Sequence, residues 1–214
     1  MYHIELYYIV NEDSNKFYQE RKTAMGKTSI KGNNAYCPQP LYLYGTYKED
    51  GQPNYGLFCW CAYCYVEKEK FVACIGEDKL TRDRIRQTGM FSATIVTEDL
   101  LQDADWCGTH PGYNFDKSSR IQSEKGAVLD VPVPEKSVWT LELKVDYTLR
   151  PNENYDSDIY VCSIENVVAD DRLVDKNLTF EEKLEMVNPV VTMCCKYVPV
   201  EFRSLGDWGK MNEN

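Results

Sequence analysis

Three cations, Lys79, Arg82 and Arg84, gather at the start of an expected helix, beside the hydroxyl of Thr81. The whole chain has a formal net charge of −10 at pH 7, so this local positive charge stands out. The first turn of a helix also presents unpaired N–H groups and a positive dipole end. Together they predict a site for an anion, with a phosphate-bearing small molecule as the expected ligand. The alternative is a solvated surface that balances three nearby carboxylates, those of Glu77, Asp78 and Asp83.

The cysteines offer a second possible chemistry. The chain has nine cysteines, an odd number, and the intervals between them along the sequence follow no repeated pattern. Neither feature favours a disulfide framework. Cys59, Cys61 and Cys64 are the densest group, and either hold a metal or fill a buried strand. In a strand, Cys59 and Cys61 share a face while Cys64 points away, so we expect no metal. Cys107 and His110 form a thinner pair, for which we also expect no metal.

Composition narrows the function class. A chain of 214 residues with 43% hydrophobic and 13% aromatic residues is expected to fold around a core. The acidic pI of about 4.8 argues against nucleic acid as a partner. No run approaches the roughly 20 apolar residues of a membrane span, and the N-terminus lacks the features of a signal peptide. We therefore expect a cytoplasmic protein without a membrane partner. Neither a dinucleotide fingerprint nor a Walker motif is found.

The elements that would position these groups are mostly strands. Runs rich in aromatic and β-branched residues predict strands over 2–10, 41–47, 54–65, 71–76, 91–96, 139–149 and 159–169. Helices are expected over 13–24, 82–88, 98–105 and 179–187, with Thr81 and Thr97 as N-caps of the second and third and Gly89 ending the second. Residues 26–34 read as a linker, 106–124 as a long loop, and 190–198 as a last apolar segment.

The hydrophobic patterns predict how the strands pair. Residues 54–65 are nearly all apolar, which predicts one long strand buried on both faces, in an antiparallel meander with 41–47 and 71–76. Residues 139–149 alternate strictly, with Leu141 on one face and Glu142 on the other, which predicts a half-exposed strand paired with 159–169. Many strands, few helices and no βαβ rhythm predict a mainly β protein, an antiparallel barrel with short peripheral helices.

An ordered set of short motifs adds to this prediction. They are Asp50-Gly51-x-Pro53-Asn54, Trp60 in the next apolar run, Lys79-x-Thr81-x-x-x-Ile85, Gly89-x-Phe91, and Ala104-Asp105-Trp106-Cys107-Gly108 followed by Gly112 and Asp116-Lys117. In this order they resemble the flavin reductase-like family of FMN-binding split barrels, to which flavoredoxins belong. The resemblance covers about 41–169. It implies a split β-barrel of Greek-key type over 35–214, with 1–34 as an N-terminal extension.

The resemblance also implies a cofactor site for FMN. The phosphate would lie at the helix entrance, on Lys79, Thr81 and the backbone amides of Arg82 and Asp83. The flavin ring would lie against the strand from Asn54 to Cys61, and Lys117 would close the site. The implied cofactor-binding residues are Asn54, Phe58, Cys59, Trp60, Cys61, Lys79, Thr81, Arg82, Asp83, Thr94, Gly112 and Lys117. Thr94 departs from the family, which often has Asn there.

Three functions follow from these observations. The resemblance implies an oxidoreductase in which FMN takes electrons from NAD(P)H and passes them to a flavin, a metal complex or a protein, with no catalytic side chain. It also implies a homodimer. The first alternative is a non-enzymatic electron carrier of the flavoredoxin type, or a flavin-binding module. The second is a plain β-barrel interaction domain whose basic helix entrance is only surface.

Overall fold

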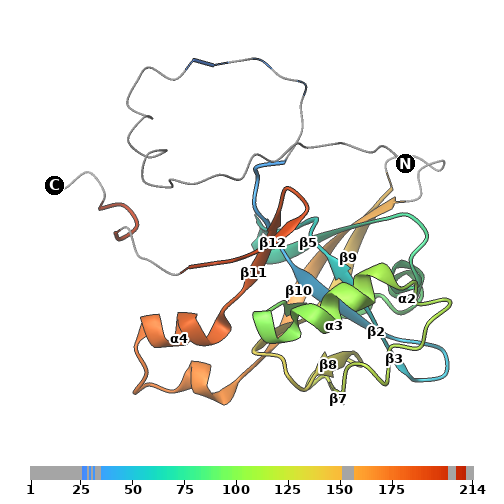
Figure 1. Ribbon diagram of the computed structural model, residues 1–214. Helices are drawn as coiled ribbons and strands as arrows, with labels where there is room; N and C mark the ends of the chain where they lie inside the picture. Colours follow the sequence, from blue (N-terminus) through green and yellow to red (C-terminus); the bar gives the residue numbers. More distant parts are fainter. Residues whose placement is uncertain are drawn as a thin grey trace. The chain divides into compact units, whose positions relative to one another are not determined.

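A computed structural model describes residues 26–27, 29, 31, 35–150, 157–201 and 206–210 of the chain (Figure 1). The fold below is that of the unit Ala35–Asn214. The strand predicted over 2–10 and the helix predicted over 13–24 lie outside the described residues. The nature of the N-terminal extension, 1–34, therefore stays a prediction.

The main sheet has seven antiparallel strands. They are β2 (Tyr42–Tyr47), β3 (Pro53–Phe58), β4 (Cys61–Val66), β5 (Lys68–Gly76), β6 (Met90–Ile95), β9 (Trp139–Leu149) and β10 (Ser157–Ala169), in the order β3-β2-β6-β9-β10-β5-β4. The two edge strands, β3 and β4, are joined by Cys59 and Trp60 alone. Because two linking residues span at most about 11 Å, the edges must come close and the sheet must curl. The fold is thus mainly β, an antiparallel split barrel, as predicted.

The predicted meander is wrong in its second half. β2 and β3 do form a hairpin, but β5 pairs with β10 and β4, far from β3 in the sheet. The predicted single strand over 54–65 is two strands, because the chain crosses from one sheet edge to the other at Cys59–Trp60. The prediction of burial on both faces also fails for β4, where Tyr65 is 77% exposed. An edge strand has a neighbour on one side only, and its apolar residues need not be covered.

Two clusters of buried side chains hold the domain together. The first fills the barrel and includes Tyr44, Phe71, Phe91, Leu143 and Tyr160. The second lies between the β2–β3 hairpin and a helix, and includes Leu43, Tyr55 and Leu100. The outward side chains of β2 and β3 therefore meet a helical layer while their inward side chains meet the barrel core.

Three α-helices occur in the described part of the chain: α2 (Leu80–Thr88), α3 (Glu98–Thr109) and α4 (Phe180–Val187). Gly89 ends α2 in the left-handed conformation, as predicted. Thr81 is not the N-cap of α2, because the helix begins earlier and Lys79 holds the cap position. Thr97 does precede α3, but the helix runs four residues further than predicted and shortens the expected loop. Figure 1 shows α3 lying beside the hairpin that it covers.

The remaining strands are short. β7 (Ser123–Lys125) pairs with β8 (Pro132–Pro134), and β1 (Gln39–Pro40) pairs with β11 (Val190–Met193), which in turn pairs with β12 (Lys196–Pro199). A 3-10 turn, η2, covers Asp171–Val174. β9 has the predicted bounds and β10 is its predicted partner. No helix within the described ranges is long and apolar enough to cross a membrane.

The predicted polar face of β9 needs a correction. Glu142, expected on an exposed face, is completely buried. Its carboxylate accepts hydrogen bonds from the backbone N–H groups of Ala127, Val128 and Leu129, and from the amide of Asn166. The segment before β8 folds over this half of β9. The Glu142 carboxylate, which the alternating pattern placed on the solvent face, therefore holds this loop through hydrogen bonds.

Candidate functional site

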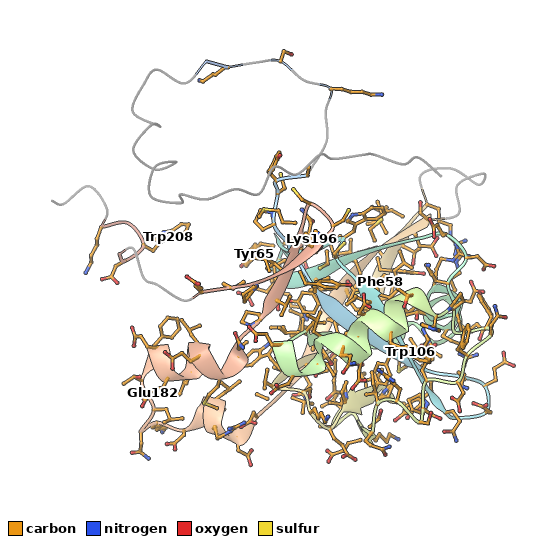
Figure 2. The ribbon with its side chains drawn as sticks, in the orientation of Figure 1. Phe58, Tyr65, Trp106, Glu182, Lys196 and Trp208 are labelled. Atoms are coloured by element: carbon orange, nitrogen blue, oxygen red, sulfur yellow. The ribbon has the colours of Figure 1, made fainter. Side chains whose placement is uncertain are left out.

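A cleft of about 110 Å³ opens between β3, the N-terminus of α2 and the segment that follows α3. Its lining comes from these three parts of the chain: Gly56, Leu57, Phe58, Asp78, Lys79, Leu80, Thr81, Cys107, Gly108, Thr109, His110, Pro111, Gly112 and Lys117. Five of the predicted cofactor-binding residues thus meet in one place. Phe58, labelled in Figure 2, stacks on Tyr44 with ring centroids 4.7 Å apart and forms part of the wall.

Lys117 is the most unusual residue of the cleft. It is only 4% exposed, and its Nζ donates hydrogen bonds to the backbone carbonyls of Tyr55 at 2.6 Å and Cys107 at 2.7 Å. No carboxylate among the described residues forms an ion pair with it. Burial, helped by the charge of Lys79, lowers the pKa of this ammonium group. A buried cation that has only dipoles as partners is costly unless an anion joins it.

The start of α2 faces the same cleft. The N–H groups of Leu80 and Thr81 precede the first hydrogen bond of the helix, which runs from Asp83 N–H to the Lys79 carbonyl at 3.2 Å. The Asp83 amide, predicted to hold a phosphate, is therefore used inside the helix. The hydroxyl of Thr81 accepts a hydrogen bond from the Asn54 amide at 3.1 Å, which ties α2 to β3.

Two glycines of the cleft pack closely against side chains of the neighbouring elements. A Cβ atom at Gly112 would lie 2.4 Å from Asn54 Oδ1, and one at Gly56 would lie 2.7 Å from the Phe58 ring and 3.1 Å from Thr81 Oγ1. A side chain at either position would therefore require these neighbours to shift. The cleft is a cradle of backbone and small groups at the meeting point of three elements, with a buried cation in its wall.

Of the predicted cation cluster, Lys79 lines this cleft, whereas Arg82 and Arg84 do not. Lys79 faces Glu77 at 3.6 Å. The guanidinium of Arg82 is buried against the Glu77 carbonyl and lies 3.8 Å from Asp78. Arg84 points to another groove, where it donates to the Tyr47 carbonyl at 2.7 Å. Neighbouring carboxylates thus balance much of the local charge, as the alternative interpretation expected, and Lys117 remains as the buried cation of the site.

Several other predicted residues lie away from the cleft. Thr94 is fully buried between β2 and β9 and shares a hydrogen bond with Thr140 at 2.8 Å. Trp60 is 56% exposed and its ring lies beside Gly76. Asp83 receives a hydrogen bond from Tyr113 at the protein surface. None of these three residues lines the cleft, so the structure of the cleft does not support the cofactor-binding roles that the resemblance implies for them.

The cysteines of the crossover also differ from expectation. Cys59 packs against the cluster under α3, whereas Cys61 packs against the barrel core, so the two do not share a face. The break between β3 and β4 removes the strand geometry on which the shared face depended. Across the described ranges, no group of three or more His, Cys, Asp or Glu side chains is arranged to hold a metal ion.

His110 lines the cleft and was not predicted to do so. Its ring stacks on Trp106, labelled in Figure 2, at 4.3 Å between centroids, and its Nδ1 lies 2.9 Å from the Trp106 carbonyl. A carbonyl only accepts, so Nδ1 carries a proton in this arrangement. The signal in the sequence is the spacing of four residues between Trp106, in the last turn of α3, and His110, the residue that directly follows the helix. The prediction ended the helix before Trp106 and so did not bring the two together.

Comparison with known proteins agrees with the fold. The family model described as flavin reductase like domain matches residues 34–184. The structure is similar to that of a flavoredoxin of Desulfovibrio vulgaris, with a TM-score of 0.75 and 22% identity, covering 86% of this chain and 98% of that one. It is also similar to an FMN-binding protein from Thermus thermophilus with bound p-hydroxybenzaldehyde, with a TM-score of 0.67 and 17% identity, covering 87% and 99%.

A third structure, from Shewanella frigidimarina, has a split barrel domain and matches with a TM-score of 0.69 and 15% identity, covering 81% of this chain and 87% of that one. No curated protein sequence is significantly similar to the chain.

Proposed function

The chain belongs to the flavin reductase-like domain family, and from this premise we propose that it binds FMN with the phosphate in the cleft at the start of α2. The observation that carries the proposal is Lys117, a buried ammonium group without a carboxylate partner in the described structure. A phosphate there would meet this charge, the Lys79 side chain and the N-terminal amides of α2 at once.

The size of the cleft supports the same placement. A volume of about 110 Å³ suits a phosphate group and adjoining atoms but not a flavin ring. The ring would therefore lie further along β3, beyond Phe58. Gly56 and Gly112 line the cleft and place no side chain of their own in it. When bound, FMN would supply the redox chemistry, and the residues of the cleft would hold and orient it.

The placement of the phosphate is tested by the double variant Lys79→Ala, Thr81→Ala. We expect it to weaken FMN binding by about tenfold while leaving riboflavin binding nearly unchanged, because only FMN carries the phosphate. Equilibrium dialysis with both ligands gives the two affinities. An equal loss for FMN and riboflavin would show that these residues act elsewhere than on the phosphate.

We propose that the FMN protein is an oxidoreductase that takes electrons from NAD(P)H and passes them to a flavin, a metal complex or a protein acceptor. The family resemblance supports this role, and the non-enzymatic electron carrier is the alternative. Anaerobic mixing of the FMN-loaded protein with NADH or NADPH is expected to bleach its visible absorption. If dithionite bleaches the protein and neither nicotinamide does, the electron carrier is the correct function.

We also propose a homodimer, formed through the outer face of the barrel. Residues paired across β9, β10, β5 and β4 point to the same side of the sheet. They make an outer apolar face that consists of Ala62, Val72, Cys74, Tyr147, Leu149, Ile159 and Val161. Tyr147 is 61% exposed on this face. The apolar residues end at Ser163, which pairs with Lys70 and Lys144 on the same side of the sheet. Contiguous apolar surface of this kind is typical of subunit interfaces.

The dimer is tested with Tyr147→Lys. Light scattering is expected to show a dimer for the unchanged protein and a monomer for the variant, because a lysine at the centre of an apolar interface would be buried without a partner. Tyr65→Lys is the control, since Tyr65 is exposed on the opposite side of the β4 edge. A variant that remains dimeric would exclude this face as the interface.

A further inference from the structure

Tyr113 connects the two walls of the cleft at the protein surface. It lies in the segment after α3 and directly follows Gly112, which lines the cleft. Its hydroxyl donates a hydrogen bond to the Asp83 carboxylate and lies 3.2 Å from the carboxylate of Asp78. Asp83 belongs to the first turn of α2, and Asp78 lines the cleft just before this helix. One side chain of the first wall is thus fastened to the helix entrance that forms the other wall.

The two carboxylates that receive this phenol are held from the helix side. The buried guanidinium of Arg82 lies 3.5 Å from Asp83 and 3.8 Å from Asp78. Arg86 adds a second cation, 3.8 Å from Asp83. Partial burial and the hydrogen bond to Asp83 raise the pKa of the Tyr113 phenol, so its hydroxyl keeps the proton that it donates. The helix entrance therefore offers a fixed acceptor to the phenol of the opposite wall.

The position of this contact makes it easy to open. Tyr113 is 47% exposed, and both of its hydrogen-bonded contacts lie at the surface. A hydrogen bond in this setting contributes little on balance, because water can replace either partner. The same segment meets the helix entrance through packing, since a Cβ atom at Gly112 would lie 3.1 Å from Leu80 Cδ2. Release of the phenol therefore loosens the wall without exposing much buried surface.

The cleft needs an opening step of this kind. It has a volume of only about 110 Å³, and Lys117 in its wall is 4% exposed. A ligand that meets the Lys117 ammonium group must pass between the start of α2 and residues 107–112. Walls that surround a ligand so closely must part to admit it and to release it. The contact that holds them together at the surface then controls this step.

We propose that Tyr113 is a positioning residue that acts as a latch on the cleft and sets how fast a phosphate monoester enters and leaves. The inference rests on the function proposed above, with FMN as the monoester. When the latch is closed, the two walls stand at the spacing that surrounds the phosphate. When the hydroxyl turns to water, the segment after α3 moves off the helix entrance and the ligand passes. The latch is closed in both the empty and the loaded protein, so it changes the rates of exchange and not the affinity.

The test is Tyr113→Phe, which removes the hydroxyl and keeps the ring. Stopped-flow mixing with FMN, followed by flavin fluorescence, should give association and dissociation rates about fivefold higher than in the unchanged protein, at nearly the same dissociation constant. Tyr197→Phe is the matched control, because its phenol donates to the exposed Asp105 carboxylate and neither residue lines the cleft. Unchanged rates in Tyr113→Phe, equal acceleration in both variants, or faster dissociation alone would overturn the latch.

Hydrogen exchange tests the latch without any ligand. In the FMN-free protein, the backbone amides of residues 108–116 should exchange faster in Tyr113→Phe than in the unchanged protein, because the segment opens more often. Tyr197→Phe should leave their exchange unchanged. The same exchange rate in Tyr113→Phe and the unchanged protein would overturn the latch whether or not FMN binds. A protein that takes up no FMN would instead contradict the proposed function, and the exchange result would still decide whether Tyr113 fastens the two walls.

Discussion

Replacing Lys117 with methionine is expected to weaken FMN binding by about 100-fold. The reason is that the variant loses a buried, charge-assisted hydrogen bond to the phosphate. Methionine keeps most of the length and volume of the side chain but carries no charge. The fold is expected to survive, because the lost bonds to the Tyr55 and Cys107 carbonyls are offset by the lower cost of burying a neutral side chain. Equilibrium dialysis against FMN measures the effect.

Lys48→Met is the matched control. Lys48 lies in the neighbouring groove, where its Nζ pairs with Asp116 at 3.4 Å, and it does not line the cleft. Its replacement removes the same charge from the same acidic protein, so a general electrostatic effect would appear in both variants. We expect unchanged FMN affinity for Lys48→Met. Equal affinities for Lys117→Met and the unchanged protein would remove Lys117 from the site.

Glu142→Gln is expected to lower the free energy of unfolding by about 3 kcal/mol. The carboxylate accepts three backbone N–H groups and the Asn166 amide, and it is fully buried. The glutamine amide group would place N–H donors against N–H donors, and a charged acceptor would be lost. Urea unfolding gives the change, and Glu124→Gln on the exposed face of β7 serves as the control.

The same carboxylate predicts a dependence on pH. Burial alone would raise the pKa of Glu142, but the hydrogen bonds from Asn166 and the three backbone amides outweigh it, and the pKa lies below its ordinary value of 4.5. A lowered folded-state pKa contributes stability that is present above the unfolded-state pKa and is lost as the pH falls through the folded-state value. The difference in stability between the unchanged protein and Glu142→Gln should therefore shrink in acid. A difference that stays constant down to low pH would contradict this account.

Strands and helices with local signals were predictable. The strict alternation of 139–149 gave the bounds of β9, and Gly89 marked the end of α2 because few other residues adopt the left-handed conformation there. The break at Cys59–Trp60 was not predictable, since an uninterrupted apolar run carries no sign that its two halves lie on opposite sheet edges. Only long-range pairing decides that.

The residues of the candidate site were likewise predictable only in part. The resemblance brought Lys117, Thr81 and Gly112 into the prediction, and the structure places all three around one cleft. The charge cluster was a weaker guide, because carboxylates of the same turn lie close enough to pair with Lys79 and Arg82. His110 escaped notice because its place on the wall depends on the true end of α3. Sequence patterns report periodicity and end signals well, but not which side chains converge.

The central claim, that this protein carries FMN, is tested most directly by the visible absorption spectrum of the freshly purified full chain. It should be read together with identification of the small molecule that boiling releases. The account predicts a yellow protein that releases FMN in an amount near one per chain, or a colourless protein that takes up FMN to that amount on titration. A protein that is colourless when isolated and stays free of FMN at saturating concentrations would contradict it.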